Sequence, residues 1–393
     1  MRNTALRVAF AALMTAGLLG GCGMLGKTTD TVAGWFSFGK KRLAEPAPLV
    51  QFAQQRAMSR AWAATAGEAG RGMFEPAVDG GAVFAAGESG RVVRINLQSG
   101  AETWRADTGR KLSAGVGVGS GLVLVGGLKG ELIALDAASG AKRWEVSLSG
   151  VAVAPPAVDG DLVVVRTGNG QVHGLNIADG SRKWLYSRQL PALSLQGVSA
   201  LAIKDGVAYA GFPGGKLAAI QLSSGLQAWE ASVSMPRGAT ELERVNDVVG
   251  TPALDGQRVC AVTYQGRVAC FDRVRGSLIW ARETSSDSGL SMDAQYVYVP
   301  DDKDAVTAYD KDTGRAAWRQ DKLANRKLTA PLSLGKYVVV ADLEGYVHLI
   351  SAEDGSFAAR AQADGLVRAA PIDIGPGFAV QSVKGGVTAF KLN

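Results

Sequence analysis

The sequence is poor in the residues from which catalytic and metal sites are usually built. Among 393 residues there are two histidines, His173 and His348, and three cysteines, none of them adjacent to another. A histidine-rich metal centre is therefore excluded, and no pattern typical of a nucleophile, base and acid triad is present. Both histidines occupy the same strand position of a repeat, where a half-buried structural imidazole is expected. We predict no catalytic residue, no metal site and no enzymatic activity.

The chain also lacks a dense run of positive charge. It has 42 Lys and Arg residues against 36 Asp and Glu residues, a net charge of +6, and the basic residues are scattered. If the N-terminal segment described in the next paragraph is removed, Arg2 and Arg7 are lost with it. The net charge then falls from +6 to about +4. Phosphate backbones are bound by clustered basic residues, so we exclude nucleic acid as a partner.

The apolar run from Val8 to Leu19 is too short to span a membrane. It follows two arginines and ends in Leu19-Gly20-Gly21-Cys22, which is typical of a secretory signal. This tetrapeptide resembles the bacterial lipobox, and the resemblance implies cleavage before Cys22 and lipid attachment there. Gly23 replaces the Asp that would retain a lipoprotein in the inner membrane, which implies the outer membrane. We predict a signal peptide over 1–21 and a lipidated tether over 22–51; an ordinary signal peptide before a chance cysteine is the alternative.

What the sequence has in place of catalytic motifs is a repeat. The stretch GELIALDAASGAKRW at 130–144 returns at 90–104, 170–184, 215–229 and 266–280, and more loosely at 304–318 and 345–359. Alternation of period two indicates strands, and the Asp and Gly positions indicate turns. Each copy ends in tryptophan except the last, which has Ala359. A four-stranded unit of about 40 residues is typical of a propeller blade.

The two ends of the chain complete one more blade. The C-terminus supplies three strands and stops before a tryptophan strand, whereas SRAWAATAG near the start is a tryptophan strand with no strands before it. We therefore predict an all-β, eight-bladed β-propeller of four-stranded antiparallel blades over 52–393, closed by N- and C-terminal strands that share a blade.

The recurring tryptophans are predicted to stabilise the ring. An indole on the outermost strand of a blade can pack on the next blade and bury a large apolar area. Sugar stacking is the alternative, and it would need exposed rings on one face. The residues assigned to blade docking are Trp62, Trp104, Trp144, Trp184, Trp229, Trp280 and Trp318.

Cys260 and Cys270 flank a hairpin and could face each other across it. A disulfide is possible in an exported protein. We expect two buried thiols instead, because the sequence does not fix the register that a disulfide requires.

The repeat G-x-x-x-A-L-D-x-x-[ST]-G-x-x-x-W resembles that of pyrroloquinoline-quinone dehydrogenases, in which tryptophans dock blade to blade. Those enzymes use a central quinone cofactor, a metal with carboxylate ligands, a catalytic Asp and often a disulfide between adjacent cysteines. This chain has no adjacent cysteines and lacks the long insertions of those enzymes. We therefore expect no cofactor, and a quinone-dependent dehydrogenase remains the alternative function.

Two connections between repeats are longer than the rest, YSRQLPALSLQGVS at 186–199 and SMPRGATELERVNDVVG at 234–250. Both follow a tryptophan strand, so they should emerge on one face from adjoining blades and form one composite patch. Leu190, Leu193 and Leu195 lie among charged residues there, as apolar cores lie within polar rims at protein interfaces. Inward folding of these leucines over the blade is the alternative.

The lipobox, the eight blades with shared closure, LSLQGVSA and TELERVNDV together resemble the BamB family, propeller lipoproteins of the outer-membrane β-barrel assembly complex. The resemblance covers nearly the whole mature chain. It implies a scaffold on the periplasmic face of the outer membrane that binds the POTRA domains of BamA, contacts other subunits and assists insertion of outer-membrane proteins. Direct binding of unfolded substrate chains to propeller edges is a further possibility.

Partner-binding residues follow from matching the family's two loops. Where the family has L-S-L-R this chain has Gln196 in place of Arg, and in the second loop Asn246 and Val249 replace a Ser and an acid of S-D-V-D. Compared with the family, this chain therefore lacks one positively charged and one negatively charged side chain in the two loops, at Gln196 and Val249. The residues that the resemblance assigns to BamA binding are Leu193, Ser194, Leu195, Gln196, Arg244, Asn246, Asp247 and Val249.

Overall fold

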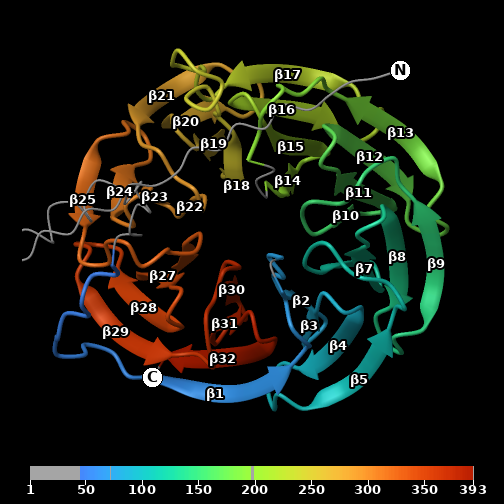
Figure 1. Ribbon diagram of the computed structural model, residues 1–393, viewed down its shortest axis with the longest axis horizontal. Coiled ribbons are helices and arrows are strands. Elements are labelled where there is room, and N and C mark those ends of the chain that lie inside the picture. The colour runs from blue at the N-terminus through green and yellow to red at the C-terminus, as the bar shows by residue number, and fades with distance from the viewer. Residues whose placement is uncertain (1–44, 71, 196–198, 393) are drawn as a thin grey trace, which may run out of the picture. The chain divides into compact units, whose positions relative to one another are not determined.

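Eight four-stranded antiparallel sheets are arranged around a ring in the computed structural model (Figure 1). The structure describes residues 45–70, 72–195 and 199–392. Residues Pro46–Asn393 form one compact unit. The prediction of an all-β, eight-bladed propeller is confirmed. No helix in the described ranges is long and apolar enough to cross a membrane.

The first four blades are consecutive in the chain. Blade 1 contains β2 (Ala77–Asp79), β3 (Ala82–Ala86), β4 (Arg91–Asn96) and β5 (Glu102–Asp107). Blade 2 contains β6 (Gly117–Gly119), β7 (Leu122–Gly126), β8 (Glu131–Asp136) and β9 (Lys142–Ser147). Blade 3 contains β10 (Ala157–Asp159), β11 (Leu162–Arg166), β12 (Gln171–Asn176) and β13 (Arg182–Ser187). Blade 4 contains β14 (Leu201–Lys204), β15 (Val207–Phe212), β16 (Lys216–Gln221) and β17 (Gln227–Ser232).

The remaining blades continue the ring, and the last uses both chain ends. Blade 5 contains β18 (Val248–Leu254), β19 (Arg258–Thr263), β20 (Arg267–Asp272) and β21 (Leu278–Glu283). Blade 6 contains β22 (Ser291–Met292), β23 (Tyr296–Pro300), β24 (Val306–Asp310) and β25 (Ala316–Gln320). Blade 7 contains β26 (Leu332–Leu334), β27 (Tyr337–Ala341), β28 (Tyr346–Ser351) and β29 (Phe357–Gln362). Blade 8 contains β30 (Ile372–Asp373), β31 (Gly377–Gln381), β32 (Gly386–Leu392) and β1 (Met58–Thr65).

The turn before each outermost strand explains the Asp and Gly of the repeat. In blade 2 one carboxylate oxygen of Asp136 accepts the backbone N–H groups of Ala138 and Ser139, at 3.1 and 2.8 Å. Gly140 follows with a φ of +75°, which a residue with a Cβ rarely adopts. The outermost strand then carries a bulge at the residue directly before its tryptophan, which in β9 is Arg143.

The core lies between neighbouring blades. The second and third strands of each blade are apolar and buried on both faces, as in β3, where all five residues are buried. One apolar cluster joins Tyr209 and Leu217 of blade 4 to Val259 and Phe271 of blade 5. Because each sheet is covered by its neighbours, no blade has a complete core of its own.

The ring is closed by hydrogen bonds between the two chain ends. β1 pairs antiparallel with β32, from Met58 opposite Leu392 to Thr65 opposite Gly386. The shared blade is therefore as predicted.

Residues 46–56, which we call the N-terminal strap, run along the outside of blade 7 before β1 (Figure 1). Ala47 N–H donates to Ala324 O at 2.9 Å, and Phe52 stacks on Phe357 with 5.3 Å between ring centroids. Residues 46–51, assigned to the tether from the sequence, thus belong to the propeller unit. Sequence could not show this, because an extended segment that packs on a sheet edge has no periodicity of its own. The predicted signal peptide and Cys22 lie outside the described residues.

Candidate functional site

The seven tryptophans of the repeat lie at the blade junctions. Each indole Nε1–H donates to a backbone carbonyl of the next blade, and a turn glycine of that blade packs against the ring. The pairs are Trp62 with Leu97 at 2.8 Å, Trp104 with Ala137 at 3.1 Å, Trp144 with Ile177 at 2.9 Å, Trp184 with Leu222 at 2.7 Å, Trp229 with Arg273 at 3.1 Å, Trp280 with Lys311 at 2.8 Å and Trp318 with Ala352 at 2.8 Å. These rings have their N–H groups satisfied inside the protein and are not arranged as an exposed sugar platform.

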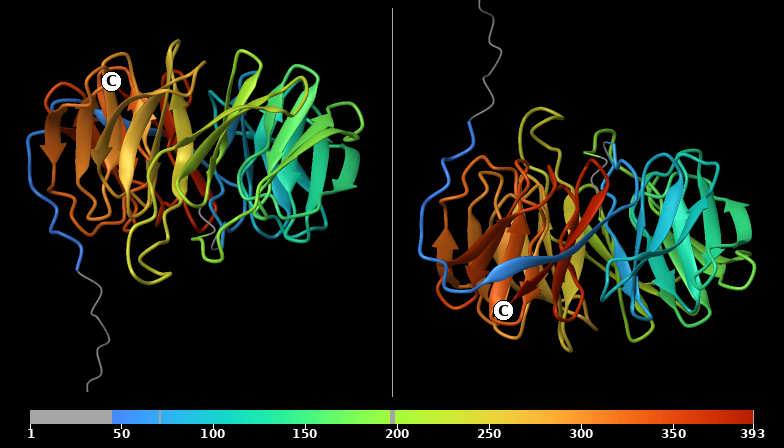
Figure 2. Two further views of the ribbon diagram at one scale, coloured as in Figure 1. Left: turned by 90° about the horizontal axis from the view of Figure 1, so that it is seen from above. Right: turned by 90° about the horizontal axis from the view of Figure 1, so that it is seen from below.

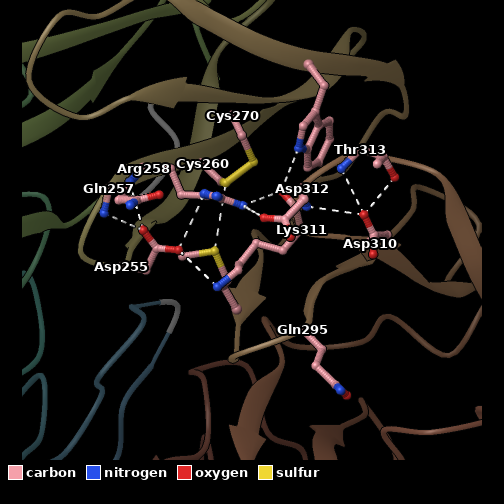
Figure 3. Close-up of polar contacts among 12 residues, drawn as sticks. Asp255, Gln257, Arg258, Cys260, Cys270, Gln295, Asp310, Lys311, Asp312 and Thr313 are labelled. Atoms are coloured by element: carbon pink, nitrogen blue, oxygen red, sulfur yellow. Dashed lines mark hydrogen bonds and ion pairs between the residues drawn. A yellow bond between two sulfur atoms is a disulfide. The ribbon is translucent and has the colours of Figure 1, made fainter.

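Cys260 and Cys270 are joined in a disulfide across β19 and β20 (Figure 3). They are direct partners in the register, with 4.0 Å between their Cα atoms. The expectation of two unlinked thiols is therefore corrected. The reason is the register itself, which the sequence did not reveal.

Beside the disulfide, an ionic cluster joins blade 5 to blade 6 (Figure 3). The Arg258 guanidinium donates to Lys311 O at 2.8 Å and pairs with Asp312 and Asp255. Lys311 Nζ lies 3.1 Å from Asp255. The pKa of Asp255 is lowered, since hydrogen bonds and these cations outweigh the burial of its carboxyl. The cluster fixes a blade junction and leaves no group poised for chemistry.

The two long connections emerge from adjoining blades on the same face of the ring (Figure 2). The first connector, residues 188–200, leads from blade 3 to blade 4, and the second, residues 233–247, leads from blade 4 to blade 5. Leu193 and Leu195 of the first are 44% and 45% exposed. Met235 and Leu242 of the second are 63% and 73% exposed. Leucine and methionine side chains this open to solvent are typical of an interaction surface.

A buried carboxyl joins the connectors. Asp247, at the end of the second connector, accepts a hydrogen bond from the Leu195 N–H at 2.6 Å. Burial raises the pKa of Asp247, while the Leu195 and Gly214 amides and the nearby Arg166 charge oppose that rise. Arg166 is itself buried and donates to Ser199 O at 3.2 Å, so it holds the other end of the first connector. Burial lowers the pKa of Arg166 to about 10, well above neutrality, so its charge is retained.

Several residues expected to contact a partner are internal instead. Asn246, Asp247 and Val249 are all buried. Asn246 accepts from the Ser234 hydroxyl at 2.7 Å, and Val249 packs in the apolar cluster around the disulfide. The expectation that these three contact a partner directly is therefore corrected. The physical reason is that the chain turns inward here to begin β18 at Val248.

Other predicted site residues remain at the surface. Leu193, Leu195 and Arg244 are exposed and Ser194 is half-buried, whereas Gln196 lies outside the described residues. Leu190 packs inward against the apolar cluster between blades 3 and 4. Met235 and Leu242 were missed, although an apolar residue beside proline and another among Glu and Arg residues are signals that sequence reading could have used.

The central channel is the place where a propeller enzyme would hold a cofactor. Its mouth is a cavity of about 270 Å³ lined mostly by small and apolar residues, with four charged ones, Glu75, Asp287, Lys327 and Arg368. Among the described residues no three His, Cys, Asp or Glu side chains are grouped to hold a metal ion. His173 and His348 are both buried in their blades.

Comparison with known proteins gives a consistent result. The family model described as outer membrane protein assembly factor BamB matches residues 88–320 and 302–392. The assembly factor BamB of Pseudomonas aeruginosa is 46% identical over 366 residues, covering 92% of this chain and 96% of that protein. The protein of the same name from Burkholderia pseudomallei is 40% identical over 348 residues, covering 88% and 91%.

Two solved structures are similar to this chain to different degrees. The crystal structure of BamB from Moraxella catarrhalis matches with a TM-score of 0.79 and 28% identity, covering 85% of this chain and 100% of that one. A quinohemoprotein alcohol dehydrogenase from Pseudomonas putida HK5 matches with a TM-score of 0.68 but 16% identity, covering 88% and 78%. The second match reflects the propeller fold alone.

Proposed function

Because this chain belongs to the BamB family of outer membrane protein assembly factors, we propose that it acts as a non-catalytic scaffold in outer-membrane protein assembly. The scaffold binds a protein partner through the two connectors. The observation that carries this proposal is the pair of connectors, which emerge on one face and carry the exposed side chains of Leu193, Leu195, Met235 and Leu242. The quinone-dependent alternative has only the shared fold in its favour.

The connector surface has the composition of a protein interface. Its exposed apolar side chains are accompanied by charged ones, such as Arg237, Glu241 and Arg244. Their ion pairs are loose: Arg244 lies 3.9 Å from Glu241, and Arg237 lies 3.5 Å from Glu283. Exposed pairs of this kind are weak, so these charges can be re-paired by a partner at little cost.

Asp247 and Arg166 act as positioning residues for this surface. They cannot contact a partner, since both are buried. Asp247 holds the first connector against the second at Leu195, and Arg166 holds it to blade 3 at Ser199. A connector held in one conformation loses less entropy on binding than a free one. Burial of these two residues therefore favours binding without direct contact.

The partner proposed for this surface is the periplasmic POTRA region of BamA, with other subunits of the assembly complex nearby. Lipid on Cys22 anchors the protein to the outer membrane from the periplasmic side. The strap supports this arrangement, because Ala47 bonds to Ala324 in a connection between blades 6 and 7, on the connector face. The strap therefore begins on the same face as the connectors.

The test is binding of the chain from residue 22, with Cys22→Ser, to a purified periplasmic fragment of BamA from the same organism. Leu193→Asp/Leu195→Asp should weaken binding at least about 10-fold, since two exposed leucines that the partner would bury are replaced by charges. Asp247→Ala should also weaken it although Asp247 is internal. Leu128→Asp is the matched control, because Leu128 is 46% exposed on a hairpin of blade 2.

Melting temperatures are measured beside each affinity, so that a loss of binding is separated from a loss of fold. Failure of the wild-type chain to bind the folded fragment would contradict the proposed partner. An equal loss in Leu128→Asp would contradict the proposed location.

A further inference from the structure

The outermost strand of blade 7 is covered by the chain's own N-terminal strap. The N–H groups of Gln55 and Arg56 donate to Ala358 O at 2.9 and 3.2 Å. Arg360 Nη1 donates to Val50 O at 3.0 Å, and the Phe52 ring lies on Phe357. β29 begins with Phe357 and Ala358, both buried under this strap. An extended segment thus covers the apolar start of an outermost strand.

Ala358 has a defined place in the blade. In the register of β28 with β29, Ile350 is opposite Phe357 and Leu349 is opposite Ala359, so Ala358 is the bulged residue between them. Its carbonyl is turned away from β28 and accepts both strap bonds. Every outermost strand from β5 to β29 carries a bulge at this position.

β21 in blade 5 has the same apolar start and no cover. Leu278 is opposite Phe271 and Trp280 is opposite Cys270, so Leu278 matches Phe357 and the bulged Ile279 matches Ala358. Leu278 is 51% exposed and Ile279 is 42% exposed. β21 is the last strand of its sheet, and in the described part of the chain no backbone N–H of a turn or loop and no side chain donates to the Ile279 carbonyl.

The other outermost strands lack this feature. Their two residues at these positions are polar, charged or small: Arg60 and Ala61, Glu102 and Thr103, Lys142 and Arg143, Arg182 and Lys183, Gln227 and Ala228, Ala316 and Ala317. Charged residues on exposed edges keep sheets from pairing with other chains. Among the described outermost strands, β21 is therefore the one that presents two large apolar side chains at these positions without a cover.

We propose that the outer edge of β21 binds an extended segment of another polypeptide by strand addition, with an apolar side chain of that segment packed on Leu278 and Ile279. The segment takes the place that the strap takes on β29, with its N–H groups on the Ile279 carbonyl. Successive side chains of a strand point to opposite sides, so a segment with alternating apolar and polar residues fits the edge.

This edge is separate from the connector surface. Leu278 follows the turn at 273–277, at the end of β21 away from the face on which the connectors emerge. Both surfaces can therefore be occupied at once. The inference does not depend on the proposed BamA contact, and failure of either can be observed alone.

The experiment measures binding of a fluorescent 11-residue peptide with alternating apolar and polar residues to the chain from residue 22 carrying Cys22→Ser. The comparison peptide has the same composition with its apolar residues in one block. Leu278→Arg/Ile279→Lys copies the Arg182 and Lys183 pair of blade 3, so the fold should be kept. The matched control, Ala316→Arg/Ala317→Lys, makes the same change on β25 of blade 6.

We expect the alternating peptide to bind wild type and the β25 variant equally, and the β21 variant at least about 10-fold more weakly. In a second measurement, the Ile279→Cys thiol should attack the 2-pyridyl disulfide of a peptide activated at a central cysteine, forming a mixed disulfide and releasing 2-thiopyridone, faster than the Ala317→Cys thiol does. The proposal is overturned if the block peptide binds as well as the alternating one, if both double variants behave alike, or if the two cysteines react at equal rates.

Discussion

Glu75 lines the mouth of the central channel together with Lys327 and Arg368, and among the described residues its carboxyl has no hydrogen bond or ion pair. Burial raises its pKa from the ordinary 4.5 to about 7. The folded protein therefore binds a proton at Glu75 over a pH range in which the unfolded chain releases it.

The sign of the resulting pH dependence follows from linkage. Between pH 4.5 and 7 the folded state holds more protons at Glu75, so the free energy of unfolding falls as pH rises through this window. The fall should be on the order of 1–3 kcal/mol. Urea unfolding at pH 5 and pH 8 should show this decrease in wild type and a smaller decrease in Glu75→Gln. Equal decreases in the two proteins would show that Glu75 is not the group responsible.

Single residues of the connector site were predictable only in part. Leu193 and Leu195 could be chosen from the sequence, because apolar residues in an otherwise polar connection indicate an interaction surface. Both side chains are exposed in the structure. Asp247 and Val249 could not be placed correctly, because exposure there depends on where β18 begins. Their spacing in the chain is the same whether the strand starts before or after them.

Among whole elements, the outermost strands depend on their glycine turns. Gly225 lies under the Trp184 ring of the preceding blade, and a Cβ placed on it would meet the ring at 2.7 Å. Gly206 has the same φ of +72° but open space around the added Cβ. Comparison of the two positions separates the contact with the ring from the strain of the backbone.

Gly225→Ala should therefore cost more stability than Gly206→Ala. The control substitution carries only the backbone strain, about 1 kcal/mol. Gly225→Ala adds overpacking against the indole, about 1–3 kcal/mol more. Urea unfolding monitored by tryptophan fluorescence measures both. Equal losses of stability in the two variants would show that the blade junction accommodates the added methyl group beside Trp184 without cost.

The strands themselves were predictable because three signals agree in each repeat: the alternation, the turn residues and the tryptophan. The strap was not, since its contacts with blade 7 involve Phe52 and carbonyl groups that have no counterpart elsewhere in the chain. The disulfide shows the same limit. Its two cysteines are visible in the sequence, but their pairing depends on the register of β19 with β20.

The whole ring depends on blade 8. β32 lies between β1 and β31, so removal of residues 386–393 leaves β1 without a partner and separates the two ends of the ring. We expect this truncation to lower the thermal midpoint strongly and to broaden the transition. Removal of residues 1–45 is the control and should leave the midpoint unchanged, because the compact unit begins at Pro46.

Circular dichroism and amide hydrogen exchange would follow both truncations. Rapid exchange should spread from blade 8 into blades 1 and 7, whose cores are shared with it. A sharp, unshifted transition after loss of 386–393 would show that seven blades are stable without closure.

Closure by the two ends also sets an order of events in time. β1 is among the first parts of the propeller to be synthesised and β32 is the last, with more than 300 residues between them. At ordinary rates of synthesis, β1 waits roughly 20 to 60 seconds for its partner. During this wait both edges of β1 are open, and pairing with β32 then closes one of them. The ring therefore cannot close until β32 has been synthesised.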